Sequence, residues 1–177
     1  MRYGIFTPVV IAAVAWTVTT SGAQAQMWHP STQVDVPRAI ELEREADIAK
    51  SDPDQWTRVA SLLRQASRLR PGNDPIAFVN LQSAGVIYGT VGKFEPARST
   101  FLELASRAIS FGEVEAAAHA FIDVTHVAVE LGDVPAARSY YERAQRLSNS
   151  SHLSSEEQQS IVMRLEPSTT LMATSSP

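Results

Sequence analysis

The sequence predicts an all-α protein of antiparallel helical hairpins that stack on one another, with about seven helices in all. Apolar residues recur at spacings of three and four over most of the chain, which places them on one face of a helix. Turn residues interrupt this pattern and predict turns near Asp52, Gly72, Gly92, Gly112, Gly132 and Ser150. The apolar stripes mix large residues with alanines, which allows close helix packing.

Residues 1–25 are predicted to be a secretory signal peptide. Arg2 gives a positive start, residues 9–18 form an apolar run, and Ala23-Gln24-Ala25 predicts cleavage before Gln26. The alternative is a retained membrane anchor, but the apolar run is short for a bilayer. We therefore expect a periplasmic or secreted protein with no integral membrane segment after cleavage.

Composition narrows the classes of partner and chemistry. The chain has 15 Lys+Arg and 19 Asp+Glu, a net charge of -4. This acidic balance argues against nucleic acid as a partner. The chain has no cysteine, which excludes disulfides and thiol chemistry. Arginine is frequent and lysine is limited to Lys50 and Lys93, which favours a bacterial source with a GC-rich genome.

The first hairpin of the domain, which we place at residues 37–166, follows an extended lead-in at residues 26–36. A helix is predicted at Arg38–Lys50. Asp52 is expected to cap the next helix, with Pro53 in its first turn. That helix has a strong inner stripe made of Trp56, Val59, Leu63, Ala66 and Leu69.

Charge separates these two helices, because the first is rich in Glu and the second in Arg. One hypothesis is a basic strip that binds an anionic ligand. The other, which we favour, is a pair of neighbouring helices with complementary charged faces. The arginines concerned are Arg58, Arg64, Arg68 and Arg70.

The third helix, at residues 74–91, is expected to begin at Asp74 and Pro75. Gly85 and Gly89 predict a close helix crossing. Later apolar stripes pass through Ala97, Phe101, Leu104 and Ala108, through Val114, Ala117, Phe121, Val124, Ala128 and Leu131, and through Val134, Ala137, Tyr141, Ala144 and Leu147.

A capping box at Ser154 and Glu157 predicts a last helix that ends near Leu165. Ile161, Val162 and Leu165 are expected to dock this helix against the others as the final cap of the stack. Residues 167–177 are rich in Ser and Thr and are predicted to be a disordered tail.

The stretch between residues 81 and 147 resembles tetratricopeptide repeats. One copy is carried by Leu81, Gly85, Tyr88, Gly92, Phe94, Ala97 and Phe101, and a weaker one by Phe121, Ala128, Gly132, Val134, Ala137 and Tyr141. The sequence departs from the family pattern at Leu81, which replaces Trp, and at Thr125, which replaces Gly. The resemblance implies a short right-handed superhelix whose concave groove holds a protein or peptide partner.

The register of the resemblance implies which residues line that groove: Gln82, Val86, His119, Ile122, His126, Val129 and Glu130. Ile122 and Val129 lie off the Phe121 stripe, so they either contact a partner or pack against the last helix or the tail. The Lys and Asn of the family's best-known peptide clamp are missing here. The partner is therefore expected to be a protein or peptide of the cell envelope other than a chaperone tail.

A second hypothesis is a small metal-binding protein or hydrolase that uses His119, Asp123 and His126. These three residues share one helix face, and two His with a carboxylate can bind zinc. The two His are seven residues apart, however, and not four as in known zinc helices. The chain also lacks a nucleophile elbow and a phosphate-binding loop. The preferred prediction is a non-enzymatic module without a cofactor.

Overall fold

The computed structural model describes residues 34–174, which form seven α-helices and one short 3-10 turn. This confirms the predicted all-α class. The predicted signal peptide and the first eight residues of the predicted lead-in, 26–33, lie outside the described residues. The helices are α1 (Val36–Ala49), α2 (Trp56–Leu69), α3 (Pro75–Thr90), α4 (Phe94–Phe111), α5 (Val114–Glu130), α6 (Val134–Ser148) and α7 (Ser155–Thr174), with the turn η1 (Pro53–Gln55) before α2.

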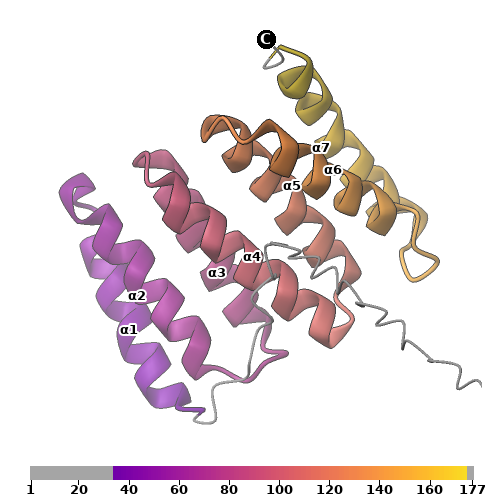
Figure 1. The fold of residues 1–177 in the computed structure, drawn as a ribbon. Coiled ribbons are helices and arrows are strands. Elements are labelled where there is room, and N and C mark those ends of the chain that lie inside the picture. The colour runs from indigo at the N-terminus through magenta and orange to yellow at the C-terminus, as the bar shows by residue number, and fades with distance from the viewer. Residues whose placement is uncertain (1–33, 175–177) are drawn as a thin grey trace, which may run out of the picture.

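Each helix packs against the next one in sequence, so the described chain is a row of stacked hairpins (Figure 1). The row begins with α1 and α2 and ends with α7, which packs against both α5 and α6. By contrast, α3 and α5 make few direct contacts. None of the helices between residues 34 and 174 is both long and apolar enough to span a bilayer.

Three turns share one geometry, which the glycine pattern predicts. Gly92, Gly112 and Gly132 have φ of 72°, 76° and 72°, the left-handed region that glycine enters without steric cost. After each glycine the next backbone N–H donates to the carbonyl five residues earlier, as Lys93 does to Tyr88 at 2.8 Å. This is the Schellman ending of a helix. It folds α3, α4 and α5 each back onto the following helix.

Side-chain caps fix several helix starts. Asp52 caps η1, and Asp74 accepts the backbone N–H of Ile76 at 2.9 Å at the start of α3. Ser154 and Glu157 exchange backbone-to-side-chain bonds of 2.6 and 3.2 Å. The predicted caps at Asp74 and Ser154 are thereby confirmed, whereas Asp52 caps the turn η1 that precedes α2 and not α2 itself. The first helix starts at Val36 because Asp35 caps it, two residues before the predicted Arg38.

The core consists of two adjoining clusters. One joins α1 to α2 through Leu42, Val59 and Ala66, and the other runs from α2 to α7. Phe101 and Phe121 are buried in the larger cluster, as their stripes predict. In the third stripe Ala137 and Ala144 are buried, whereas Tyr141 is only half-buried.

The last helix differs from the prediction in two ways. It continues to Thr174 and so passes through Pro167 and most of the predicted disordered tail. Proline cannot donate to the carbonyl of Met163, but both residues are exposed, so water can satisfy that carbonyl. Ile161 and Leu165 are buried as predicted, whereas Val162 points outward and is exposed.

Candidate interaction surface

The structure separates the seven residues predicted to line a groove into three groups. Ile122 is fully buried in the larger core cluster. Gln82, His119, His126 and Val129 are half-buried. Val86 and Glu130 are exposed. The seven residues therefore do not form one open surface.

The prediction that Ile122 contacts a partner is wrong, because α7 packs against α5. Ile161 and Leu165 of α7 belong to the same core cluster as Ile122. Ile122, an apolar residue outside the Phe121 stripe, is therefore buried within the chain itself. The burial of Ile122 in this shared cluster favours the alternative prediction, packing against the last helix or the tail.

Asp123 connects the first helices of two hairpins, α3 and α5, with the last helix α7. Its carboxylate accepts from Nε2 of Gln82 on α3 and from Nη2 of Arg164 on α7, each at 2.8 Å. The Asp123 side chain is largely buried. Since direct contacts between α3 and α5 are few, this carboxylate is a main link between them.

His119 and His126 lie on either side of Asp123 along α5 and are both half-buried. Burial lowers the pKa of both side chains, and the nearby Arg164 lowers them further, while Asp123 opposes the change. Nε2 of His119 is 3.4 Å from Oε1 of Glu115. The structure does not support the alternative hypothesis of a metal site here, because residues 34–174 contain no group of three or more His, Cys, Asp or Glu that could hold a metal ion.

Among residues 34–167, α3 carries the largest number of exposed large apolar side chains. Ile76, Val79 and Val86 are 47%, 61% and 50% exposed. Their spacings of three and seven residues put them on one face, which points away from the buried side of α3 with Leu81, Ala84 and Tyr88. No residue of α3 is charged. The stripe formed by Ile76, Val79 and Val86, here called the α3 stripe, is therefore an uncharged surface in the interior of the row.

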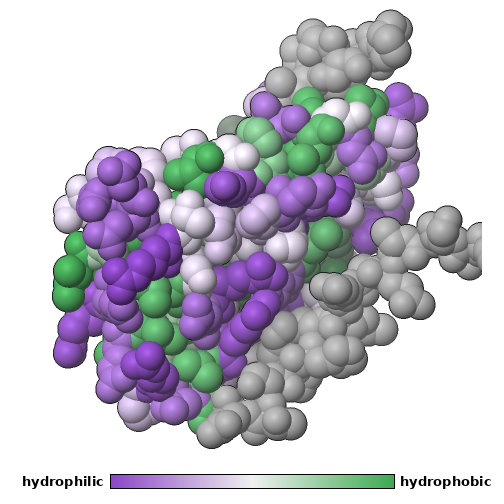
Figure 2. All heavy atoms as spheres, turned by 60° about the vertical axis from the view of Figure 1, so that its left-hand side comes forward, coloured by the Kyte–Doolittle hydropathy of each residue, from purple (hydrophilic) through white to green (hydrophobic). Residues whose placement is uncertain are grey.

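On each of the other helices within residues 34–167, at most two large apolar residues are exposed. On α1, for example, the exposed Ile40 and Ile48 are separated by Arg44 and Asp47. Figure 2, which brings the side of Figure 1 with α1 and α2 forward, shows apolar patches broken up by hydrophilic residues. Isolated exposed apolar side chains are usual on protein surfaces, so the α3 stripe is the better candidate for a contact surface.

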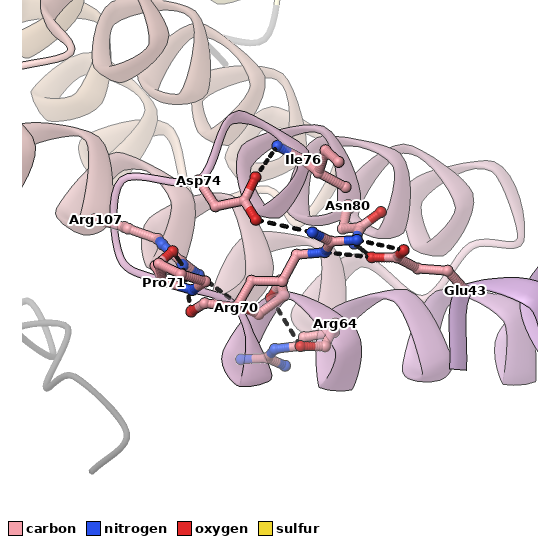
Figure 3. Close-up of polar contacts among 9 residues, drawn as sticks. Glu43, Arg64, Arg70, Pro71, Asp74, Ile76, Asn80 and Arg107 are labelled. Carbon is pink, nitrogen blue, oxygen red and sulfur yellow. Dashed lines mark hydrogen bonds and ion pairs between the residues drawn. The ribbon is translucent and has the colours of Figure 1, made fainter. Parts of the chain in front are cut away.

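A buried polar network fixes the start of α3 (Figure 3). The guanidinium of Arg70 binds both oxygens of Glu43 on α1 at 2.7 Å and binds Asp74, the cap of α3, at 2.8 Å. Asn80 of α3 also donates to Glu43, at 2.6 Å. The contact with Arg70 lowers the pKa of Glu43 despite its partial burial. The α3 stripe thus begins on a rigidly held helix end.

Arg107 of α4 holds the same end from the other side. Its side chain is fully buried and donates to the carbonyls of Ser67, Arg70, Pro71 and Gly72 at 2.6–3.2 Å. These carbonyls end α2 and lead into α3, where the negative end of the helix dipole favours a cation. Burial lowers the pKa of Arg107, and Glu103 and Asp74 oppose the change.

Three arginines of α2 and Arg70, which follows its last residue, are paired within the protein. Arg58 and Arg70 bind Glu45 and Glu43 of α1, as the favoured hypothesis predicts. Arg64 and Arg68 instead bind Glu103 of α4, each at 2.8 Å. Burial would raise the pKa of Glu103, but these two arginines lower it. The pairing favours a structural role over a basic strip for an anionic ligand.

The fold defines the class as an all-α protein of stacked helical hairpins. No family model matches the chain, and neither a curated protein nor a solved structure is significantly similar to it. The resemblance to tetratricopeptide repeats therefore stays a prediction.

Sequence reasoning found Val86 but missed Ile76 and Val79, the other members of the α3 stripe. The signal that could have found them is a helix with no charged residue and apolar residues on both sides.

Proposed function

We propose that this chain is a non-enzymatic, tetratricopeptide-like module that holds a protein or peptide partner against the α3 stripe. The observation that carries this proposal is a row of three exposed aliphatic side chains on a helix without charges. Exposed apolar surface of this kind is typical of contact sites. The stacked hairpins of the described chain suit such a role, because they present a rigid surface.

The chemistry of α3 selects the class of partner. Because α3 has no Asp, Glu, Lys or Arg, it can neutralise no charge on a partner that lies over the stripe. The partner is therefore a segment with aliphatic or aromatic residues and no charge at the centre of the contact.

The proposal places this partner in the cell envelope, because residues 1–25 read as a signal peptide. The module would then work in the periplasm or outside the cell. The intact mass of the exported form tests this location. We expect a chain that begins at Gln26, and a retained leader would contradict the soluble periplasmic form.

The partner site is tested by capture from an envelope extract with two matched variants. Val86→Asp puts a charge on the α3 stripe, and Val162→Asp makes the same change at a similarly exposed position on α7. We expect the first variant to lose a bound protein that the second retains. Circular dichroism checks that both variants are folded. Equal capture by both variants would place the partner elsewhere.

A further inference from the structure

The chain enters the described domain beside the start of α3. The backbone N–H of Asp35 donates to the carbonyl of Leu69, the last residue of α2, at 2.8 Å. Residues 70–74 lead from there to α3, and Arg70 joins α1 to the cap of α3. Residues that precede Val34 therefore start close to the end of α3 that carries Ile76 and Val79.

The segment before Val34 has a composition that suits binding to the α3 stripe. Residues 26–33 read Gln-Met-Trp-His-Pro-Ser-Thr-Gln and contain no Asp, Glu, Lys or Arg. Met27 and Trp28 are large apolar residues. Pro30 disfavours a helix and favours an extended chain. A segment without charged side chains and with an aromatic anchor matches an uncharged aliphatic surface.

We propose that Met27 and Trp28 of this chain dock on the α3 stripe, so that the N-terminal segment occupies the partner site until a partner displaces it. The inference rests on the proposed function for the partner, but the docking itself needs no partner.

The length of the segment fits this contact. Five residues lie between Trp28 and Val34. The six steps of an extended chain, at about 3.3 Å each, cover about 20 Å in total. The α3 stripe extends over ten residues of helix at 1.5 Å each, or about 15 Å. Trp28 can therefore lie along the stripe while Asp35 keeps its bond to Leu69.

Tryptophan fluorescence tests the docking, because the chain has three tryptophans. A Trp16→Phe, Trp56→Phe variant leaves Trp28 as the only one, whether or not residues 1–25 are removed. We expect its emission to lie at short wavelength and to resist quenching by acrylamide. Adding Val79→Asp should shift the emission and the quenching constant to those of free N-acetyltryptophanamide. Adding Val162→Asp on α7 should change neither.

Two results of the quenching experiment would overturn the inference. One is a Trp28 that is fully solvated in the parent protein. The other is a protected Trp28 that does not respond to Val79→Asp, because it then docks elsewhere. A dilution series separates docking within one chain from docking between copies. An emission maximum that shifts on dilution would show exchange between copies and would also contradict the proposal.

The proposed function can fail independently of this docking. If Val86→Asp leaves capture unchanged while Trp28 still responds to Val79→Asp, the segment docks but the partner binds elsewhere. If both proposals hold, Trp28→Ala should increase capture, because the competing segment no longer fills the site.

Discussion

The ring of Phe101 on α4 lies directly over Gly85 on α3. A Cβ atom at Gly85 would be only 2.5 Å from Cε1 of that ring. Real side chains do not approach this closely, so only glycine allows α3 and α4 to pack as they do. The site for Gly89, four residues later, differs, because a Cβ there meets nothing within 4 Å.

Gly85→Ala should therefore destabilise the protein by about 1–3 kcal/mol, the usual cost of an overpacked core. Gly89→Ala is the matched control. It should raise stability by up to about 0.5–1 kcal/mol, because alanine favours the helix. Urea unfolding midpoints of both variants measure the difference. If Gly85→Ala is as stable as Gly89→Ala, the ring does not lie over Gly85.

The sequence predicts a close crossing at both glycines, and only the one at Gly85 is confirmed. Helical spacing identifies residues that share a face, but the two glycines are four apart and lie about 40° from each other around the helix. Which of them meets a large side chain depends on the position of Phe101 along α4. That position is a property of the packed pair and is not encoded in α3.

The second copy of the predicted repeat shows the same dependence on packing. Thr125 stands at the position of Gly85, and Tyr141 at the position of Phe101, each 40 residues later. Thr125 is buried, and its hydroxyl donates to the carbonyl of Phe121 at 2.9 Å. A residue with a side chain leaves no room for a ring at this crossing, and Tyr141 is accordingly only half-buried.

Phe101→Ala and Phe121→Ala should each destabilise the protein by about 3–5 kcal/mol, the usual cost of emptying an aromatic core site. Both rings are buried, and Phe121 also stacks on Tyr140 with ring centroids 6.3 Å apart. Phe111→Ala is the control, because Phe111 is exposed at the end of α4. Denaturant midpoints check all three. If Phe111→Ala lowered the stability as much as Phe101→Ala, the assignment of Phe101 to the core would be contradicted.

The buried Arg107 shows what the sequence could not predict about the end of α3. Its acceptors are four backbone carbonyls that lie 35–40 residues earlier in the chain. Every residue type has such a carbonyl, so no side-chain pattern indicates this contact. By contrast, the caps at Asp52, Asp74 and Ser154 are local and could be predicted.

Arg107→Met should destabilise the protein by at least about 3 kcal/mol. This substitution leaves several buried carbonyls without a hydrogen-bond donor, and each unsatisfied carbonyl costs about 1–3 kcal/mol of stability. Arg107→Lys should restore only part of the loss, because lysine keeps the charge but not the planar fork that reaches several acceptors. Arg138→Met on the exposed face of α6 is the control. Thermal unfolding of the three variants tests the order of stability.

The position of α5 in the sequence could be predicted, but which of its residues are exposed could not. Ile122 is an apolar residue off the core stripe, a pattern that fits a partner contact as well as it fits packing against α7. The outcome depends on where α7 docks, which Ile161, Leu165 and the ion pair between Arg164 and Asp123 determine together. Those contacts join residues about 40 positions apart, so they could not be assigned from α5 alone.

Stability should fall as the pH decreases from about 6.5, the ordinary pKa of histidine. The pKa of His119 and of His126 is lowered in the folded protein, first by burial and then by Arg164. The unfolded chain therefore binds more protons than the folded one, and acid favours unfolding. The stabilisation is fully present above about 6.5 and is lost as the pH falls through the folded pKa values. Urea midpoints at about pH 7.5 and 5.5 measure the change.

A double variant with His119→Gln and His126→Gln should remove most of this pH dependence, whereas His152→Gln, in the exposed loop before α7, should leave it in place. Carboxylates also make the stability depend on pH, but over a separate and more acidic pH range. The pKa values of Glu43, Asp74 and Glu103 are lowered, so their contribution is present above about 4.5 and is lost below it. A full pH dependence between about 5.5 and 7.5 in the double variant would show that the two histidines do not cause it.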